Sequence, residues 1–309
     1  MMDHIAYVER RPEPGETVRG TSFVLSEGGK GYNQAVAAAR AGAAVRMIGR
    51  VGDDSLGLRF RNELAKEHIE VAGVSIDEHS GTGVGLPVVD RAGENAIVII
   101  PGANDEVTET MIDAAADLIT SSNVLLLQLE IPQAVAVHAA RLAKAAGVIV
   151  ILNPAPADAI DAFNGLVDIV VPNRSELDAL APAASIDESA ATLSASLGGS
   201  RVIVTLGAQG ALVVDGDQSL RIPSVPVEAV DTTGAGDSFC GNVAARVGMG
   251  DTLFEAARYA VAAAGLSVTR RGAASSNPTA AEVAEAIATQ RKTRIHDGDG
   301  RLGALEAGS

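Results

Sequence analysis

Cysteine, tryptophan and long apolar runs are scarce or absent in this sequence. The single cysteine, Cys240, excludes a disulfide framework and a cysteine-based zinc site. Tryptophan is absent and aromatic residues make up 3% of the chain, although 47% of residues are hydrophobic. A core must therefore consist mainly of Ala, Val, Leu and Ile. No apolar run approaches the roughly 18 residues of a membrane span, and the first residues carry charges where a signal peptide needs an apolar stretch. The sequence predicts a cytoplasmic protein with no membrane partner.

Positive charge is also in short supply. The 24 Lys and Arg residues face 39 Asp and Glu residues, which gives a net charge of −15. Such a surface repels polyanions, so nucleic acid is excluded as a partner. A site for a phosphorylated ligand must then depend on backbone dipoles, on a bound cation or on a few placed basic residues. The five histidines show no metal-ligand spacing.

Short apolar runs alternate with Ala-rich stretches of helical spacing from about residue 43 onward. The strand-like runs include VLLLQLE, VIVILNP, VDIVVPN and VIVTLG. Continuous apolar strands that alternate with helices indicate a parallel sheet covered on both faces. The predicted fold class is α/β, with three layers (α/β/α), a doubly wound arrangement and a mostly parallel sheet.

Two ranges break this alternation. Residues 3–27 and about 81–100 have the pattern of strands and turns with no helix between them. Extra strands at one edge of an α/β domain predict a small β lid over the site or a contact between two copies of the chain. We expect one domain over residues 1–290. The polar, Gly-rich segment 291–309 is predicted to be a disordered tail.

The stretch DTTGAGDSFCG, residues 231–241, places a glycine-rich turn before a helix-like segment. A helix that opens after such a turn presents unpaired N–H groups and the positive end of its dipole, which together bind anions such as phosphate. Asp237 at this position has two interpretations. It is either a base that takes a proton from an attacking hydroxyl or only the N-cap of the helix.

Polar residues also follow the predicted strands. Glu130, Asn153 and Asn173 come after three apolar runs, and Thr205 to Gly207 follow a fourth. In open parallel sheets, ligands bind at the carboxyl ends of the strands. Together with the stretch around Asp237, these residues predict a functional edge of the sheet.

Several motifs resemble one protein family in order and spacing: GGKGYNQAVAAARAGA, LQLEIP, LNPAPA, PNRSELD, TLGAQG, DTTGAGDSFCG and TRRGAASSNP. The family is that of the ribokinase-like, phosphofructokinase-B-type sugar kinases, and the resemblance covers nearly everything before the tail. The GAGD motif is specific for this superfamily, and GGKGxNQA narrows the match to ribokinase-type members. GGKG lacks the spacing of a P-loop and does not predict an ATP cradle.

The resemblance implies ATP-dependent phosphorylation of D-ribose at O5 to ribose 5-phosphate. Asp237 would be the catalytic base that deprotonates the sugar hydroxyl, and the N–H groups of Gly234, Ala235 and Gly236 would form the anion hole. The implied cofactors are Mg²⁺, which binds with ATP, and a monovalent cation, usually K⁺.

The same resemblance implies four sets of contacts. The sugar would be bound by Asp3, Gly29, Lys30, Gly31, Asn33, Glu130 and Asp237. ATP would contact Asn173, Thr205, Leu206, Gly207, Gly210 and Gly236. The K⁺ shell would comprise Asp231, Thr233, Ser267, Arg270, Gly272 and Ser276. Glu176 would order Mg²⁺ through water.

The sequence departs from the family pattern near its start. Family members begin with a strand of the central sheet that ends in a motif like GSxNxD, and the corresponding aspartate here is Asp3, so we expect the first core strand to be missing. Tyr32 replaces a common alanine and would either narrow the sugar pocket or pack on the neighbouring helix. We therefore keep three alternatives open: a kinase for another sugar such as 2-deoxyribose or fructose, a nucleoside kinase, and a catalytically silent sugar- or nucleotide-binding protein. The lid strands also predict a homodimer.

Overall fold

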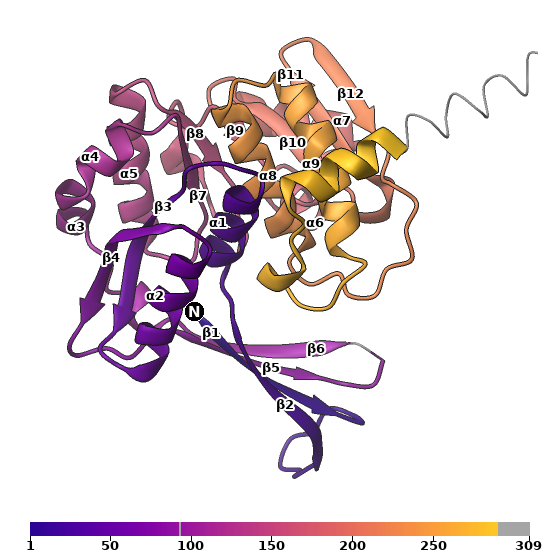
Figure 1. The fold of residues 1–309 in the computed structure, drawn as a ribbon. Coiled ribbons are helices and arrows are strands. Elements are labelled where there is room, and N and C mark those ends of the chain that lie inside the picture. Colours follow the sequence, from indigo (N-terminus) through magenta and orange to yellow (C-terminus); the bar gives the residue numbers. More distant parts are fainter. Residues whose placement is uncertain (93, 290–309) are drawn as a thin grey trace, which may run out of the picture.

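A six-stranded sheet forms the centre of the larger body of the protein (Figure 1). The computed structural model describes residues 1–92 and 94–289. The strand order is β12-β11-β10-β9-β8-β7, in which β7 to β10 run parallel, β11 is antiparallel to β10, and β12 is antiparallel to β11. The bounds are β7 Val124–Leu127, β8 Ile149–Leu152, β9 Ile169–Val170, β10 Arg201–Thr205, β11 Ala211–Asp215 and β12 Gln218–Ile222.

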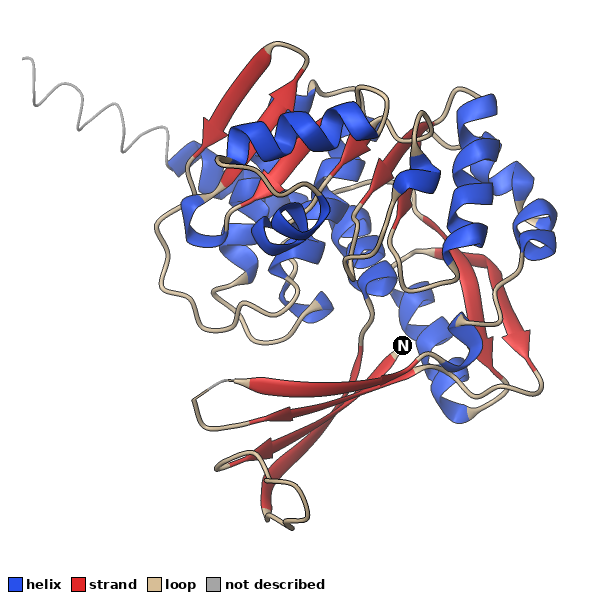
Figure 2. Ribbon diagram, turned by 180° about the vertical axis from the view of Figure 1, so that it is seen from behind, coloured by secondary structure: helices blue, strands red, loops and turns tan. Residues whose placement is uncertain are grey.

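Helices cover both faces of this sheet, because alternate strand residues point to opposite sides (Figure 2). Val150 and Leu152 are buried against the helices α3 to α7, whereas Ile151 between them is buried against α8 and α9. The bounds are α3 Glu109–Ala114, α4 Ala116–Thr120, α5 Gln133–Ala145, α6 Arg174–Leu180, α7 Ile186–Ser196, α8 Ala235–Gly248 and α9 Leu253–Ser267. Residues 280–289 are helical as well. The result is the three-layer α/β/α arrangement that the sequence predicts.

A second sheet extends away from this body (Figures 1 and 2). Its order is β2-β1-β5-β6, and β1 pairs antiparallel with β2 and parallel with β5. The bounds are β1 Met2–Val8, β2 Gly20–Glu27, β5 Val84–Val89 and β6 Asn95–Ile100. Each of the two ranges that break the helix–strand alternation thus contributes two neighbouring strands. We call this four-stranded sheet the lid.

A separate parallel pair, β3 (Arg46–Gly52) and β4 (Glu70–Asp77), is packed with α1 (Lys30–Arg40) and α2 (Ser55–Lys66). Within the described residues, β3 has no strand partner on its second edge, and neither has β7. A cleft of about 500 Å³ lies between these two strands, with α1 and α8 along it. The six-stranded sheet and the β3–β4 pair are therefore two separate sheets. A strand between β3 and β7 would be needed to join them into one continuous sheet.

The short 3₁₀ turns complete the element list: η1 Gly102–Asn104, η2 Asp161–Phe163, η3 Gly207–Gln209 and η4 Ala274–Ser276. Among the described residues, no helix combines the length and apolarity that crossing a bilayer requires. The tail predicted to be disordered, residues 291–309, lies outside the described residues.

Candidate active site

The start of helix α8 is shaped by Gly234. This residue is the N-cap and adopts the left-handed conformation, with φ of 72°. A Cβ here would also lie 2.9 Å from Cα of Ala273, so both the backbone angle and the space require glycine. No side chain caps the helix. Its first turn therefore presents orphan N–H groups and the positive end of the helix dipole.

Asp237 lies in the first turn of α8, whose N-cap is Gly234, and its side chain does not cap the helix, so the N-cap interpretation is wrong. Its carboxylate is 9% exposed and faces α1, where Asn33 Nδ2 donates to Oδ2 and Gln34 Nε2 donates to Oδ1, each at 2.9 Å. Burial raises the pKa of Asp237, although the charge of Lys30 and the two amide donors act in the opposite direction. A buried carboxylate with a raised pKa in the first turn of a helix is a candidate for proton transfer.

Helix α1 begins at the GGKG loop, and Glu130 fixes that start. Gly29 is the N-cap of α1 with φ of 87°, and Glu130 Oε2 accepts a hydrogen bond from Lys30 N at 2.7 Å. Burial raises the pKa of Glu130, whereas the N–H and charge of Lys30 favour its ionised form. The loop after β7 and the start of α1 thus meet beyond the carboxyl end of β7.

Asp3 reaches the same place from the lid. A Cβ on Gly28 or Gly85 would lie 2.0 Å or 2.3 Å from a carboxylate oxygen of Asp3, so the lid backbone passes directly against this side chain. Burial raises the pKa of Asp3, and the nearby Met1 amino group acts against that shift. The contacts given above place Asp3, Glu130 and Asp237 around the start of α1, with carboxylates and amides that suit the hydroxyls of a polyol.

On the nucleotide side of the predicted site, Asn173 and Glu176 form a capping box at the start of α6. Asn173 Oδ1 accepts from Glu176 N at 2.9 Å, and Glu176 Oε2 accepts from Asn173 N at 2.8 Å. Glu176 therefore has a structural role, and burial raises its pKa. Asn173 also bridges to Thr205, which brings two of the predicted ATP contacts together.

The turn after Thr205 depends on two glycines. Gly207 has φ of 56° and Gly210 has φ of 91°, and a Cβ on Gly210 would lie 2.0 Å from the carbonyl oxygen of Ile222. Leu206 N donates to Gly210 O at 2.8 Å and closes the turn. The turn places the backbone of Leu206, Gly207 and Gly210 beside Thr205 at the carboxyl end of β10.

The predicted cation loop, residues 267–277, meets the segment around Asp231. Asp231 Oδ1 accepts from Thr233 N and Oδ2 accepts from Gly272 N, each at 2.9 Å. Burial acts to raise the pKa of Asp231, but the hydrogen bonds outweigh it and the pKa lies below its ordinary value. The hydroxyls of Ser267 and Ser276 donate to the carbonyls of Ala264 and Ala273 and keep lone pairs as acceptors. Within residues 1–92 and 94–289, no group of three or more His, Cys, Asp or Glu side chains could hold a metal.

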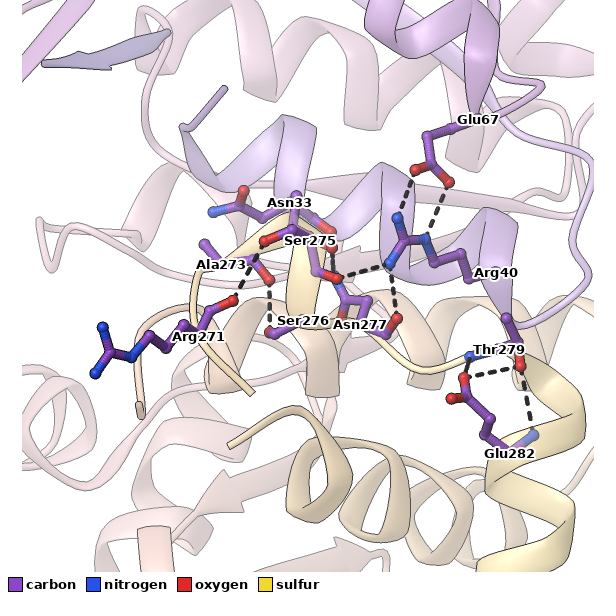
Figure 3. Close-up of polar contacts among 11 residues, drawn as sticks. Asn33, Arg40, Glu67, Arg271, Ala273, Ser275, Ser276, Asn277, Thr279 and Glu282 are labelled. Atoms are coloured by element: carbon purple, nitrogen blue, oxygen red, sulfur yellow. Dashed lines mark hydrogen bonds and ion pairs between the residues drawn. The ribbon is translucent and has the colours of Figure 1, made fainter. Parts of the chain in front are cut away.

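Arg40 at the end of α1 ties this loop to the helix (Figure 3). Its Nη1 donates to Ser275 O at 3.1 Å and to Asn277 O at 2.8 Å. Glu67 holds the same guanidinium through two hydrogen bonds of 2.6 and 3.0 Å. Because Ala273 of the loop packs against Gly234, Arg40 connects α1 through this loop to the turn that opens α8.

Sequence reasoning missed Arg40, Gln34 and Gln128 as parts of the site. The one available signal is that Gln34 directly follows Asn33 in GGKGYNQ, so it lies in the same first turns of α1. Tyr32, for which two interpretations remained open, packs against Phe60 of α2, with the ring centroids 5.0 Å apart. Its contact with the neighbouring helix is thus established, while its ring also borders the cleft.

Comparisons with known proteins identify the class of protein to which this fold belongs, that of the sugar kinases. The family model of the pfkB family carbohydrate kinases matches residues 1–280. The chain belongs to that family and is a ribokinase-like sugar kinase, as the motifs indicate.

Three relatives illustrate the similarity. A ribokinase of Haemophilus influenzae is 40% identical over 288 residues, covering 92% of this chain and 94% of that protein. A deoxyribokinase of Salmonella typhi is 36% identical over 285 residues, covering 90% and 93%. The solved structure of Arabidopsis thaliana ribokinase complexed with ribose and ATP has a TM-score of 0.85 and 30% identity, covering 92% of this chain and 95% of that one.

Proposed function

We propose that this chain transfers the γ-phosphoryl group of ATP to the 5-hydroxyl of D-ribose. The observation that supports this most directly is the Asp237 carboxylate, buried, held by two amides and placed in the uncapped first turn of α8. A base beside an anion-binding helix start is the arrangement that phosphoryl transfer to a hydroxyl requires.

In the proposed reaction, Asp237 accepts the proton of the sugar hydroxyl while that oxygen forms a bond to the γ-phosphorus. The bond from the γ-phosphorus to the bridging oxygen breaks, and ADP leaves with the electron pair. The N–H groups at the start of α8, from Gly234 to Gly236, would stabilise the charge on the phosphoryl oxygens. Ala235 N donates to Thr232 O at 3.2 Å in this structure, so that N–H would have to exchange partners.

The sugar is proposed to be bound by Asp3, Asn33 and Glu130 together with the GGKG backbone. Carboxylates accept hydrogen bonds from hydroxyls, and an amide both donates and accepts them. This set of side chains therefore favours a free polyhydroxylated sugar over a nucleoside. 2-Deoxyribose is the second candidate, because a deoxyribokinase is among the similar proteins. The ribose and ATP bound in the Arabidopsis relative support D-ribose as the first candidate.

The residues around Asp231 fit a monovalent cation. One carboxylate, several backbone carbonyls and the Ser276 hydroxyl are hard oxygen donors, as carbonyl oxygens are for K⁺ in other proteins. Asp231, Thr233, Ser267, Arg270, Gly272 and Ser276 would hold the ion. Mg²⁺ would enter with ATP and neutralise phosphate charge. Oε2 of Glu176 is used in the capping box, and its Oε1 would accept a hydrogen bond from a water bound to Mg²⁺.

We also propose that the cleft between β3 and β7 can take up one further extended strand, because both facing strand edges lack a partner within the described residues. Met1 borders the cleft together with Gly29 and Glu130, at the carboxyl ends of both strands. A segment that runs into Met1 through the cleft would therefore lie parallel to β3 and β7.

Release of ADP by the purified chain tests the proposed activity. We expect turnover with ATP, Mg²⁺, K⁺ and D-ribose, less with 2-deoxyribose and fructose, and none with adenosine. Omission of K⁺ should lower the rate. Binding of ribose and ATP without ADP release would instead establish the silent binding protein, and preference for another acceptor would replace ribose as the substrate.

A further inference from the structure

The side chain of Gln34 is fully buried and uses its whole amide group. Gln34 Nε2 donates to Asp237 Oδ1 at 2.9 Å and to Asn153 Oδ1 at 3.0 Å, and its Oε1 accepts from Gln128 Nε2 at 2.5 Å. Both amide protons are therefore committed. With 0% exposure, this side chain is not accessible from solvent.

The partners of Gln34 are anchored in the central sheet. Asn153 follows β8 and donates from Nδ2 to Val171 O, after β9, at 2.9 Å, and Gln128 follows β7. Gln34 thus connects α1 and α8 to the carboxyl ends of three parallel strands. These are rigid elements, and a buried polar network whose members satisfy one another holds its geometry closely.

We propose that Gln34 is the positioning residue of the phosphoryl transfer: it fixes the Asp237 carboxylate in the orientation in which it meets the sugar hydroxyl. The proposal rests on the role of Asp237 as base. Asn33 holds the other carboxylate oxygen, but Asn33 is also an expected sugar ligand, whereas Gln34 has no contact except within the protein. Without the Gln34 amide, the carboxylate would keep one donor and could rotate about its side chain.

The charged groups around Asp237 influence its pKa, so loss of the Gln34 donor should appear as a change in that pKa. Lys30 on α1 favours the ionised carboxylate, while Glu130 after β7 and Glu176 on α6 interact with it as like charges. The thiol of Cys240 on α8 is buried nearby. Removal of the Gln34 amide takes away one of the few groups that favour the charged form, so proton uptake by Asp237 moves to higher pH.

The test compares kcat and its pH dependence in Gln34→Met, which has nearly the same length and no amide. We expect kcat to fall roughly tenfold or more, as for the loss of a hydrogen bond to a charged group. The acid limb of the profile should move to higher pH, and KM for ATP should stay unchanged. Gln34→Leu serves as the second variant if the methionine variant folds poorly, as judged by Tm.

The matched control is Asn242→Leu, which removes a buried amide on α8 that donates to Ser238 O, whereas the Asp237 carboxylate accepts from Asn33 and Gln34. It should lower Tm without moving the acid limb. A folded Gln34 variant with the wild-type kcat and acid limb would overturn the positioning role. Asp237→Asn separates the two ideas: if that variant keeps the wild-type kcat, the base assignment itself fails, whatever Gln34 does.

Discussion

At the scale of single residues, the raised pKa of Asp237 predicts the pH dependence of the reaction. A base must be ionised, and burial raises the pKa of this carboxyl above the ordinary value of about 3.9. The rate should therefore fall as pH decreases through a value higher than that of an exposed aspartate. The measurement is kcat/KM for the sugar against pH. An acid limb at the ordinary aspartate value or below would contradict it.

Gly234 gives a second prediction at this scale. Gly234→Ala combines a positive φ with a Cβ that would lie 2.9 Å from Ala273, so α8 must shift. We expect a loss of about 1–3 kcal/mol in the free energy of unfolding, together with a large fall in kcat.

The control for that variant is Gly147→Ala at the end of α5. Gly147 also has a positive φ, of 76°, but its Cβ would meet nothing within 4 Å. It should cost about 1 kcal/mol from the backbone alone and leave kcat unchanged. Equal effects of the two substitutions on kcat would show that the start of α8 tolerates displacement.

At the scale of elements, the open cleft between β3 and β7 predicts that an added strand stabilises the protein. The test is an extension before Met1 as long as β3, seven residues, rich in valine. Burial of its side chains, less the entropy of ordering, should add on the order of 2–5 kcal/mol to the free energy of unfolding. Hydrogen exchange should show new protection of the outward amides of β3 and β7.

An extension with proline at its centre is the matched control, since proline removes a backbone donor and is excluded from central strands. It should give neither the stability nor the protection. Equal stability of the chain with and without the valine extension would contradict the proposal that the cleft takes a strand.

Local patterns in the sequence were enough for the elements but not for their long-range contacts. Short apolar runs predict the strands around Ile151 and Ile203, and the glycines of the GAGD motif predict the start of a helix. These signals lie within a few neighbouring residues of the chain. The bond between Gln34 and Asp237 joins residues 203 positions apart, and the contact of Arg40 with Asn277 joins residues 237 apart. No local pattern encodes such pairs, so Gln34, Gln128 and Arg40 became visible only in three dimensions.

At the scale of the whole molecule, the lid predicts a homodimer. Consecutive residues of β6, Ile97 to Ile100, are each exposed by 50% or more, as is Phe23 of β2. Since neighbours along a strand point to opposite faces, the lid exposes apolar side chains on both faces, where an antiparallel sheet usually keeps one polar. A second lid would cover such a surface.

Two double substitutions separate the faces of the lid. We expect the wild type to sediment as a dimer. One of two double variants, Ile97→Lys with Ile99→Lys on one face or Val98→Lys with Ile100→Lys on the other, should sediment as a monomer. The variant that does so identifies the face that contacts the partner. Arg91→Glu, in the exposed turn before β6, is a control for altered charge. A wild-type chain that is monomeric at micromolar concentration would contradict the dimer.

The proposed chemistry is tested most directly by the turnover of Asp237→Asn with ATP and D-ribose, measured beside the wild type and with ribose binding determined by calorimetry. Asparagine keeps the shape of the side chain and removes its basicity. We predict that kcat falls by about two to four orders of magnitude while ribose still binds. An Asp237→Asn protein with kcat close to that of the wild type would contradict the assignment of Asp237 as the base.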